Sequence, residues 1–165
     1  NRPLERGFHA APSTNQDKHC ANWGMSYTNR TGVLLPAGAT LHSANFLDAL
    51  RARRVYATMD KSSQLVFLGN EQIMGSRLRN EGPLNLRVLF ASSGGHTVTR
   101  VQIQEGVPGR NGSVSTLVES PTHSFTPSLG AHFYYAKVTQ EDGDLLWSAP
   151  IWVEQLEPLL VDGVE

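Results

Sequence analysis

The stretch that decides the fold is HFYYAKV, residues 132–138, in which the side chains alternate between two sets. Because successive side chains on a β-strand point to opposite faces, residues two apart share a face. One face then carries one aromatic and two apolar side chains: Tyr134, Ala136 and Val138. The other face carries two aromatic side chains and a lysine: Phe133, Tyr135 and Lys137. The stretch is therefore predicted to be a β-strand.

The same period of two continues along the chain from about Gln64. LRVLF, residues 86–90, places three apolar side chains on one face: Leu86, Val88 and Phe90. RVQIQ, residues 100–104, directs two side chains inward, Val101 and Ile103, and two outward, Gln102 and Gln104. LLWSAPIWV, residues 145–153, is predicted to place five side chains on one side: Leu145, Trp147, Ala149, Ile151 and Val153. Pro150 in this last run fits a sheet edge or a bulge better than a central position.

Turn signals separate these runs. They are Gly69-Asn70, Gly82-Pro83, Gly94-Gly95, Pro108-Gly109, Asn111-Gly112 and Asp142-Gly143. Short strands bounded by turn residues at such spacing are typical of antiparallel β-sandwiches. We therefore predict a mainly β protein, with an immunoglobulin-like antiparallel β-sandwich over residues 59–156 and an acidic tail over residues 157–165.

Residues 1–58 are predicted to form a separate unit. The first 42 residues are rich in Pro and Gly, which argues against a long helix there, and a short strand is expected at residues 8–11. One helix is predicted over residues 44–54, with Ser43 as its N-cap. Its apolar stripe has helical spacing and consists of Phe46, Leu47 and Leu50. The β-prone VYAT, residues 55–58, should leave the helix as a strand.

The composition excludes several classes of protein. The chain has 165 residues and a formal net charge of −1, whereas a nucleic-acid-binding protein usually has a basic excess or a basic face. No stretch approaches the roughly 18 apolar residues that a membrane-spanning helix needs. The single cysteine, Cys20, cannot form an internal disulfide. Because the chain opens on Asn1 and not on Met, we expect it to be a piece of a longer polypeptide.

One short segment points to chemistry: TNQDKHCANWG, residues 14–24. It holds Asp17 and His19, which would lie on the same side of an extended segment because they are two apart. A carboxylate and an imidazole together suit zinc, manganese or iron. The alternative is an ordinary loop, in which Asp17 accepts local hydrogen bonds beside a solvated His19.

Together with its surroundings, this segment resembles the closing part of the PHP-type metallohydrolases, the superfamily named for its polymerase and histidinol-phosphatase members. The resemblance rests on motifs in the family's order, which cover roughly the first 75 residues: GFHAAPSTNQDKHCANWG, RTGVL, ALRARRVYAT and MDKSSQLVFLGNEQIMGS. In that family a distorted β/α barrel carries the metal ligands. The last ligand motif is an Asp-x-His, matched here by Asp17 and His19, and in exported members a β-sandwich often follows the barrel.

The resemblance implies that the chain is the C-terminal part of a metal-dependent phosphoesterase, in which a metal-bound water attacks the phosphoester substrate. The family's other ligands, including a His-x-His pair, lie upstream, and this chain contains no His-x-His. Because a zinc centre needs three or four protein ligands, Asp17 and His19 cannot form one alone. We therefore expect the chain to be inactive by itself and to pack against an upstream barrel of the same polypeptide.

Three more residues match the family's motifs: Asn15, Asn22 and Trp23. Asn15 and Arg30 are candidates for orienting the substrate, and for Arg30 the alternative is a structural ion pair. Trp23 is expected to pack in the loop.

A second hypothesis belongs to a different class, a non-catalytic β-sandwich module that binds a carbohydrate or a protein. Its candidates are four aromatics that are otherwise expected in the core: Tyr134, Tyr135, Trp147 and Trp152. A self-sufficient module should bury four residues near its N-terminus: Phe8, Trp23, Val33 and Leu34. The C-terminal part of a larger enzyme should instead leave this region exposed and prone to self-association.

Overall fold

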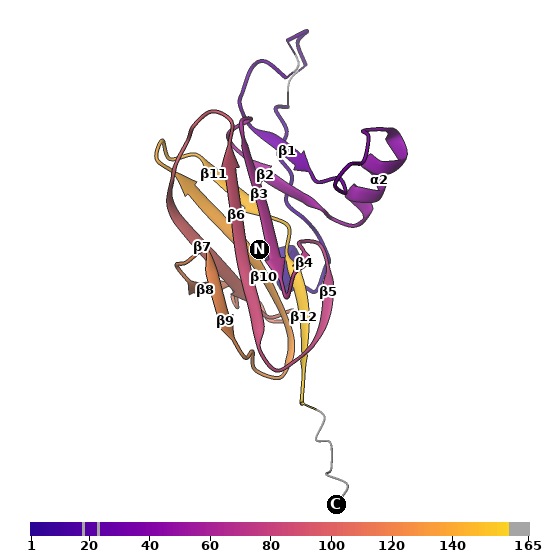
Figure 1. Cartoon of the computed structure of the whole chain (residues 1–165), viewed down its shortest axis with the longest axis vertical. Helices are drawn as coiled ribbons and strands as arrows, with labels where there is room; N and C mark the ends of the chain where they lie inside the picture. The colour runs from indigo at the N-terminus through magenta and orange to yellow at the C-terminus, as the bar shows by residue number, and fades with distance from the viewer. Residues whose placement is uncertain (18, 23, 159–165) are drawn as a thin grey trace, which may run out of the picture.

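The computed structural model describes residues 1–17, 19–22 and 24–158. These residues form two β-sheets packed face to face, with two short helices outside them (Figure 1). The helices are α1, Arg2–Glu5, and α2, Ser43–Arg51. The prediction of a mainly β protein built as a β-sandwich is confirmed.

The larger sheet is organised around β10, Gly130–Gln140. One edge of β10 pairs with β7, Val98–Gly106, and β7 pairs in turn with β8, Ser115–Val118. The other edge pairs with two strands in succession, β11, Leu145–Ser148, and β12, Ile151–Leu156. All of these pairings are antiparallel, so β10 has partners on both edges.

Three further strands extend the larger sheet beyond β11 and β12. β2, Val55–Thr58, pairs with β11, and β1, Arg30–Val33, pairs with β2. β5, Arg77–Glu81, runs parallel to β12. The strand predicted at residues 55–58 is thus confirmed, and both β1 and β2 belong to the sandwich. The assignment of residues 1–58 to the remnant of a barrel stays a prediction.

The smaller sheet has the strand order β4-β3-β6-β9. Its strands are β3, Ser63–Gly69; β4, Gln72–Ile73; β6, Leu84–Ser92; and β9, Thr122–Phe125. The main core lies between the two sheets and receives from β10 the face that the alternation predicted: Tyr134, Ala136 and Val138. Opposite them, β3 and β6 contribute Leu65, Phe67, Leu86 and Val88. The predicted inward face of residues 86–90 is therefore confirmed, with Phe90 partly buried at its end.

The outer face of the larger sheet is also covered in part. Phe133, Tyr135 and Trp152 form a second hydrophobic cluster there, and Leu4 of α1 packs against it. Glu5 is buried beside them, and its carboxylate accepts a hydrogen bond from the main-chain N–H of Val114 at 3.1 Å. Residues 8–11, which were expected to form a strand, form none and continue this covering segment, so that prediction is wrong.

The prediction that residues 145–153 share one side of a single strand is wrong. The run divides at Pro150 into β11 and β12. Leu146 lies in the main core with Ile151, whereas Trp147 packs against the outer cluster. Pro150 itself lies outside the ladder, as expected for a residue without an N–H, and its carbonyl accepts the N–H of Gly75 at 2.8 Å.

Helix α2 begins one residue before the predicted start and ends three residues before the predicted end. Its N-cap is His42 and not Ser43, and His42 Nδ1 accepts the N–H of Asn45 at 3.5 Å. Within the helix only Ala49 is buried. The predicted apolar stripe faces solvent, and its three side chains are 38–45% exposed: Phe46, Leu47 and Leu50.

Among the described residues, no helix is both long and apolar enough to cross a membrane. Of the predicted tail, only Glu157 and Pro158 are described, and neither belongs to a helix or strand.

A buried carboxylate links the two sheets. Asp60, in the turn between β2 and β3, is 6% exposed. It accepts hydrogen bonds from the Ser62 N–H at 2.8 Å, the Ser63 hydroxyl at 2.6 Å and the Gln140 amide at 3.2 Å. Burial alone would raise the pKa of Asp60, but these hydrogen bonds outweigh it and hold the pKa well below its usual value of 3.8.

Replacing Asp60 with Asn should lower the free energy of unfolding at neutral pH by about 1–3 kcal/mol, because an amide NH₂ would meet donors that now meet a carboxylate. The depressed folded-state pKa means that the carboxylate's contribution is present above the unfolded-state pKa and is lost as the pH falls through the folded-state pKa. Urea denaturation should therefore show the difference between parent and variant shrinking below about pH 4.

The matched control for this prediction is Asp48→Asn, which removes an exposed carboxylate that pairs with Arg51 at 3.2 Å. It should change the free energy of unfolding by less than about 0.5 kcal/mol. An Asp60→Asn effect of the same size at neutral and acidic pH would show that the carboxylate charge is not what stabilises this turn.

Candidate functional site

The loop that carries the predicted metal motif precedes β1, at one edge of the larger sheet. Figure 1 shows it at the same end of the molecule as α2. Three of the four predicted site residues line one surface hollow of about 410 Å³: Asn15, Asp17 and Arg30. The fourth, His19, lies beside Asp17. The structure therefore brings the four residues into one region of the surface.

Asp17 and His19 present their polar atoms to solvent. His19 Nε2 lies 3.7 Å from Asp17 Oδ1, and the two side chains are 89% and 91% exposed. Asp17 adopts a left-handed conformation, with φ of +45°, and not the extended conformation that was expected. Its N–H donates to Asn15 Oδ1 at 3.1 Å, which is an Asx turn. A turn, and not the alternation of a strand, thus brings the two side chains together.

Arg30 organises the loop from within. Its guanidinium donates to the main-chain carbonyls of Tyr27 and Asn29, each at 2.8 Å, and to the carbonyl of Gly24. It forms no ion pair with any residue that the structure describes, so the structural ion pair considered as the alternative is not formed there. These contacts make Arg30 a residue that shapes the loop, and its role toward a substrate stays a prediction.

Further hydrogen bonds tie the two ends of the loop together. Thr31 Oγ1 accepts from the N–H of Thr14 and donates to the carbonyl of Thr14, both at 2.9 Å. The Asn29 amide donates to the carbonyl of Asn15 at 2.7 Å. The loop is therefore held by bonds between its side chains and its backbone, whereas among the described side chains the Asp17 carboxylate forms an ion pair with His19 alone.

The donor set fits a divalent metal in type and spacing but not in number. Two ligands about 2.1 Å from a tetrahedral ion are about 3.4 Å apart, so the 3.7 Å between Asp17 and His19 needs only a small adjustment. Within residues 1–17, 19–22 and 24–158, however, no group of three or more His, Cys, Asp or Glu side chains could hold an ion. Trp23, which was expected to pack in this loop, lies outside the described residues.

The hollow at the loop is lined by polar residues, but apolar side chains are exposed nearby. Met25 within the loop is 85% exposed, and the stripe on α2 faces solvent at the same end of the molecule. The described residues that should distinguish a self-sufficient module from the C-terminal part of a larger enzyme give a mixed result. Phe8 is 61% exposed, as expected for part of a larger protein, but Val33 and Leu34 pack partly against the main core.

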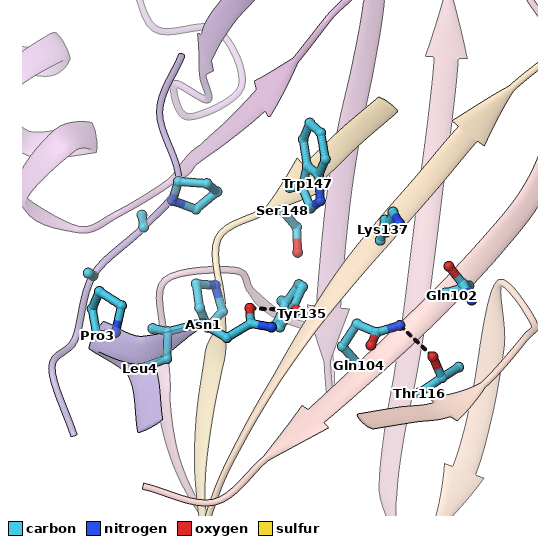
Figure 2. Close-up of a pocket in the computed structure, with 14 residues that line it drawn as sticks. Asn1, Pro3, Leu4, Gln102, Gln104, Thr116, Tyr135, Lys137, Trp147 and Ser148 are labelled. Carbon is cyan, nitrogen blue, oxygen red and sulfur yellow. Dashed lines mark hydrogen bonds between the residues drawn. The ribbon is translucent and has the colours of Figure 1, made fainter. Parts of the chain in front are cut away.

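The four strand aromatics do not form a common binding face. Tyr134 lies in the main core, and Tyr135 and Trp152 are buried in the outer cluster. Trp147 is half-buried and reaches a second hollow, of about 550 Å³, between residues 1–12 and the outer face of the larger sheet (Figure 2). Strand periodicity could not reveal this hollow, because it depends on how the N-terminal segment packs.

Comparison with known proteins adds little. No family model matches the chain, and no curated protein matches it. Among solved structures, the crystal structure of an engineered protein is similar to the chain with 19% sequence identity and a TM-score of 0.38. The match covers 56% of this chain and 20% of that protein, so the chain spans about a fifth of its length. At this TM-score the likeness does not establish a shared fold.

Replacing Arg30 with Ala should release the loop, because three main-chain carbonyls lose their donor. Such bonds contribute about 1 kcal/mol each, so amide hydrogen exchange of residues 14–29 should quicken by at least about tenfold while β10 is unchanged. Exchange followed by mass spectrometry measures this. Arg100→Ala, which removes an exposed arginine of β7 that lies 3.9 Å from Glu119, is the matched control. Unaltered exchange in the loop of Arg30→Ala would show that the guanidinium does not hold it.

Proposed function

We propose that the chain is the C-terminal part of a PHP-type metal-dependent phosphoesterase, to which it contributes the ligand pair Asp17 and His19. The observation that carries the proposal is the geometry of this pair. The two side chains lie 3.7 Å apart and are almost fully exposed, on a loop whose backbone is otherwise held by internal hydrogen bonds. The pair also lies within the motif segment that resembles the family, and its exposed polar atoms are open to further ligands.

The remaining ligands would come from the barrel that the resemblance implies, because two donors leave at least two positions of a zinc or manganese ion unfilled. When bound, the ion would lower the pKa of a coordinated water and stabilise the negative charge that develops on the phosphoester. Asp17 and His19 would hold the ion.

Two neighbours of the pair would have different tasks. Asn15 Oδ1 is engaged by the N–H of Asp17, which leaves the Asn15 NH₂ group to donate to an anionic oxygen in the hollow that both residues line. Arg30 is engaged by three carbonyls and would act mainly by holding the loop. Phosphoesters are thus the substrate class that the proposal assigns.

The apolar surface beside the loop supports a large partner at this end of the molecule. The apolar stripe of α2 contributes little to the stability of the sandwich alone, because only Ala49 of the helix is buried. A barrel packed on Phe46, Leu47 and Leu50 would remove this surface from water, and because only 38–45% of each side chain is exposed, the gain would be about 0.6–1.3 kcal/mol each. Self-association of the isolated chain through the same surface follows as a further expectation.

Isothermal titration calorimetry with zinc and manganese tests the proposal. The chain of 165 residues should bind either ion weakly, with a Kd of about 1 mM or above, because a two-donor site is incomplete. In a polypeptide that also contains the barrel, Asp17→Ala/His19→Ala should lower the bound metal and the hydrolysis of a phosphodiester such as bis(p-nitrophenyl) phosphate by at least about a hundredfold.

The chain offers a matched control, since His96 and Asp142 form a second Asp–His pair at 3.5 Å far from the motif in sequence. His96→Ala/Asp142→Ala should leave metal content and hydrolysis unchanged. Tight, stoichiometric binding by the chain of 165 residues would mean that a complete site exists within it and would overturn the proposal. Full activity of Asp17→Ala/His19→Ala in the longer polypeptide would do the same.

A further inference from the structure

The second hollow lies on the outer face of the larger sheet and is independent of the metal motif. Residues of the N-terminal segment, among them Pro3, Leu4 and Pro12, form one wall. The strands β7, β8, β10 and β11 supply the floor (Figure 2). Its volume of about 550 Å³ lies within the range of about 300–1,000 Å³ that is usual for ligand pockets.

The floor consists of two rows of side chains that cross the strands. In the first row, Lys137 of β10 lies opposite Trp147 of β11 on one side and Gln102 of β7 on the other. In the second row, Gln104 of β7 lies opposite Tyr135 of β10 and Thr116 of β8. Directly opposed side chains have Cβ atoms about 4.5–5.5 Å apart. The floor therefore presents two aromatic side chains, a cation and two amides as cross-strand neighbours, and Figure 2 shows Lys137 between Trp147 and Gln102.

The hydrogen bonds of the floor leave acceptors free. The Gln104 amide NH₂ donates to the Thr116 hydroxyl at 2.9 Å, and the Gln102 NH₂ donates to Glu119 at 2.8 Å. Neither amide oxygen accepts a hydrogen bond from a described residue. These bonds fix the two side chains, so their carbonyl oxygens are set to receive hydroxyl donors from a ligand.

Lys137 carries the only charged side chain among the described residues that line the hollow. It is half-buried and forms no ion pair with a residue in the described part of the chain. A partly enclosed ammonium without a counter-charge is complementary to an anionic group, which would gain a charge-assisted hydrogen bond there.

We propose that this hollow binds an acidic saccharide, a chain of pyranose rings that carries carboxylates. The C–H face of one ring would lie on Trp147, because the face of an aromatic ring is electron-rich. Sugar hydroxyls would donate to the amide oxygens of Gln102 and Gln104, and a carboxylate would pair with Lys137. The inference does not rest on the metal site, and it names a ligand that the sandwich would hold whether or not a barrel is attached.

An acidic peptide fits this floor less well. Extended peptides bind to sheets by pairing with the free N–H and C=O groups of an edge strand. The floor is mainly a sheet face: β7, β10 and β11 are paired on both edges, and among the floor strands β8, which contributes Thr116, is the one with a free edge. A phosphate-rich polymer is also disfavoured, because a single lysine and no arginine line the hollow.

Titration of the chain with tetragalacturonate, followed by amide chemical shifts and calorimetry, tests the proposal. We expect a Kd between about 0.1 and 1 mM, shift changes confined to β7, β10, β11 and residues 1–12, and binding at least about tenfold weaker to neutral galactotetraose. Lys137→Met should weaken tetragalacturonate binding about tenfold and leave galactotetraose unchanged. Trp147→Ala should weaken both, whereas Trp147→Phe, which keeps an aromatic ring, should stay within about threefold of the parent.

The control for Lys137→Met is Lys61→Met, which removes an exposed lysine from the turn before β3 and should not alter binding. A melting curve for each variant separates lost binding from lost folding, and Lys137→Met is a half-exposed change that should keep the fold. The proposal is overturned if the acidic and neutral tetrasaccharides bind equally, or if Lys137→Met binds as the parent does. It is also overturned if polyglutamate competes as well as tetragalacturonate, or if uronate tetrasaccharides of galacturonate, glucuronate and mannuronate all fail to bind at about 10 mM.

Discussion

Both faces of β10 carry large apolar side chains, and each face needs a cover. Tyr134 and Val138 meet the smaller sheet in the main core, whereas Phe133 and Tyr135 face the other way. Because burying such a side chain stabilises the fold by about 1.5–3 kcal/mol, an open outer face would be costly. The N-terminal segment provides the cover through α1. The packing of Phe133 also requires glycine at position 106, because a Cβ there would lie 2.2 Å from the Phe133 ring.

The N-terminal segment that covers the outer face of β10 also determines where the two candidate sites lie. Residues 1–12 cross the outer face and enclose the hollow over Tyr135 and Trp147, with the Tyr135 hydroxyl donating to Asn1 Oδ1 at 2.9 Å. The chain then turns into the loop of the metal motif before it enters the sheet at β1. Thr14, at the start of the loop, is bonded to Thr31 of β1, so the loop is closed at its base on the edge of the sheet.

The sequence predicted elements well where a regular period was uninterrupted, and failed where a distant contact or a single residue intervened. HFYYAKV revealed β10 and its two faces, because the strand is paired on both edges. It could not show that α1 buries the second face. The alternation through residues 145–153 breaks at Pro150, which changes the side on which Trp147 lies. The site was predicted as a set of residues only, because the approach of Asp17 to His19 depends on a left-handed residue that spacing does not reveal.

One row of residues connects the loop to the hollow. Thr31 lies opposite Ala57, Ala57 opposite Trp147, Trp147 opposite Lys137, and Lys137 opposite Gln102. Neighbouring strands are about 4.8 Å apart, so Thr31, which anchors the metal-motif loop, is two strand spacings, about 10 Å, from Trp147 in the floor of the hollow. Directly opposed residues share a face of the sheet, which places Thr31 and Trp147 on the same outer surface. The base of the metal-motif loop and the floor of the hollow therefore lie on one continuous surface, joined by the row of residues from Thr31 to Lys137.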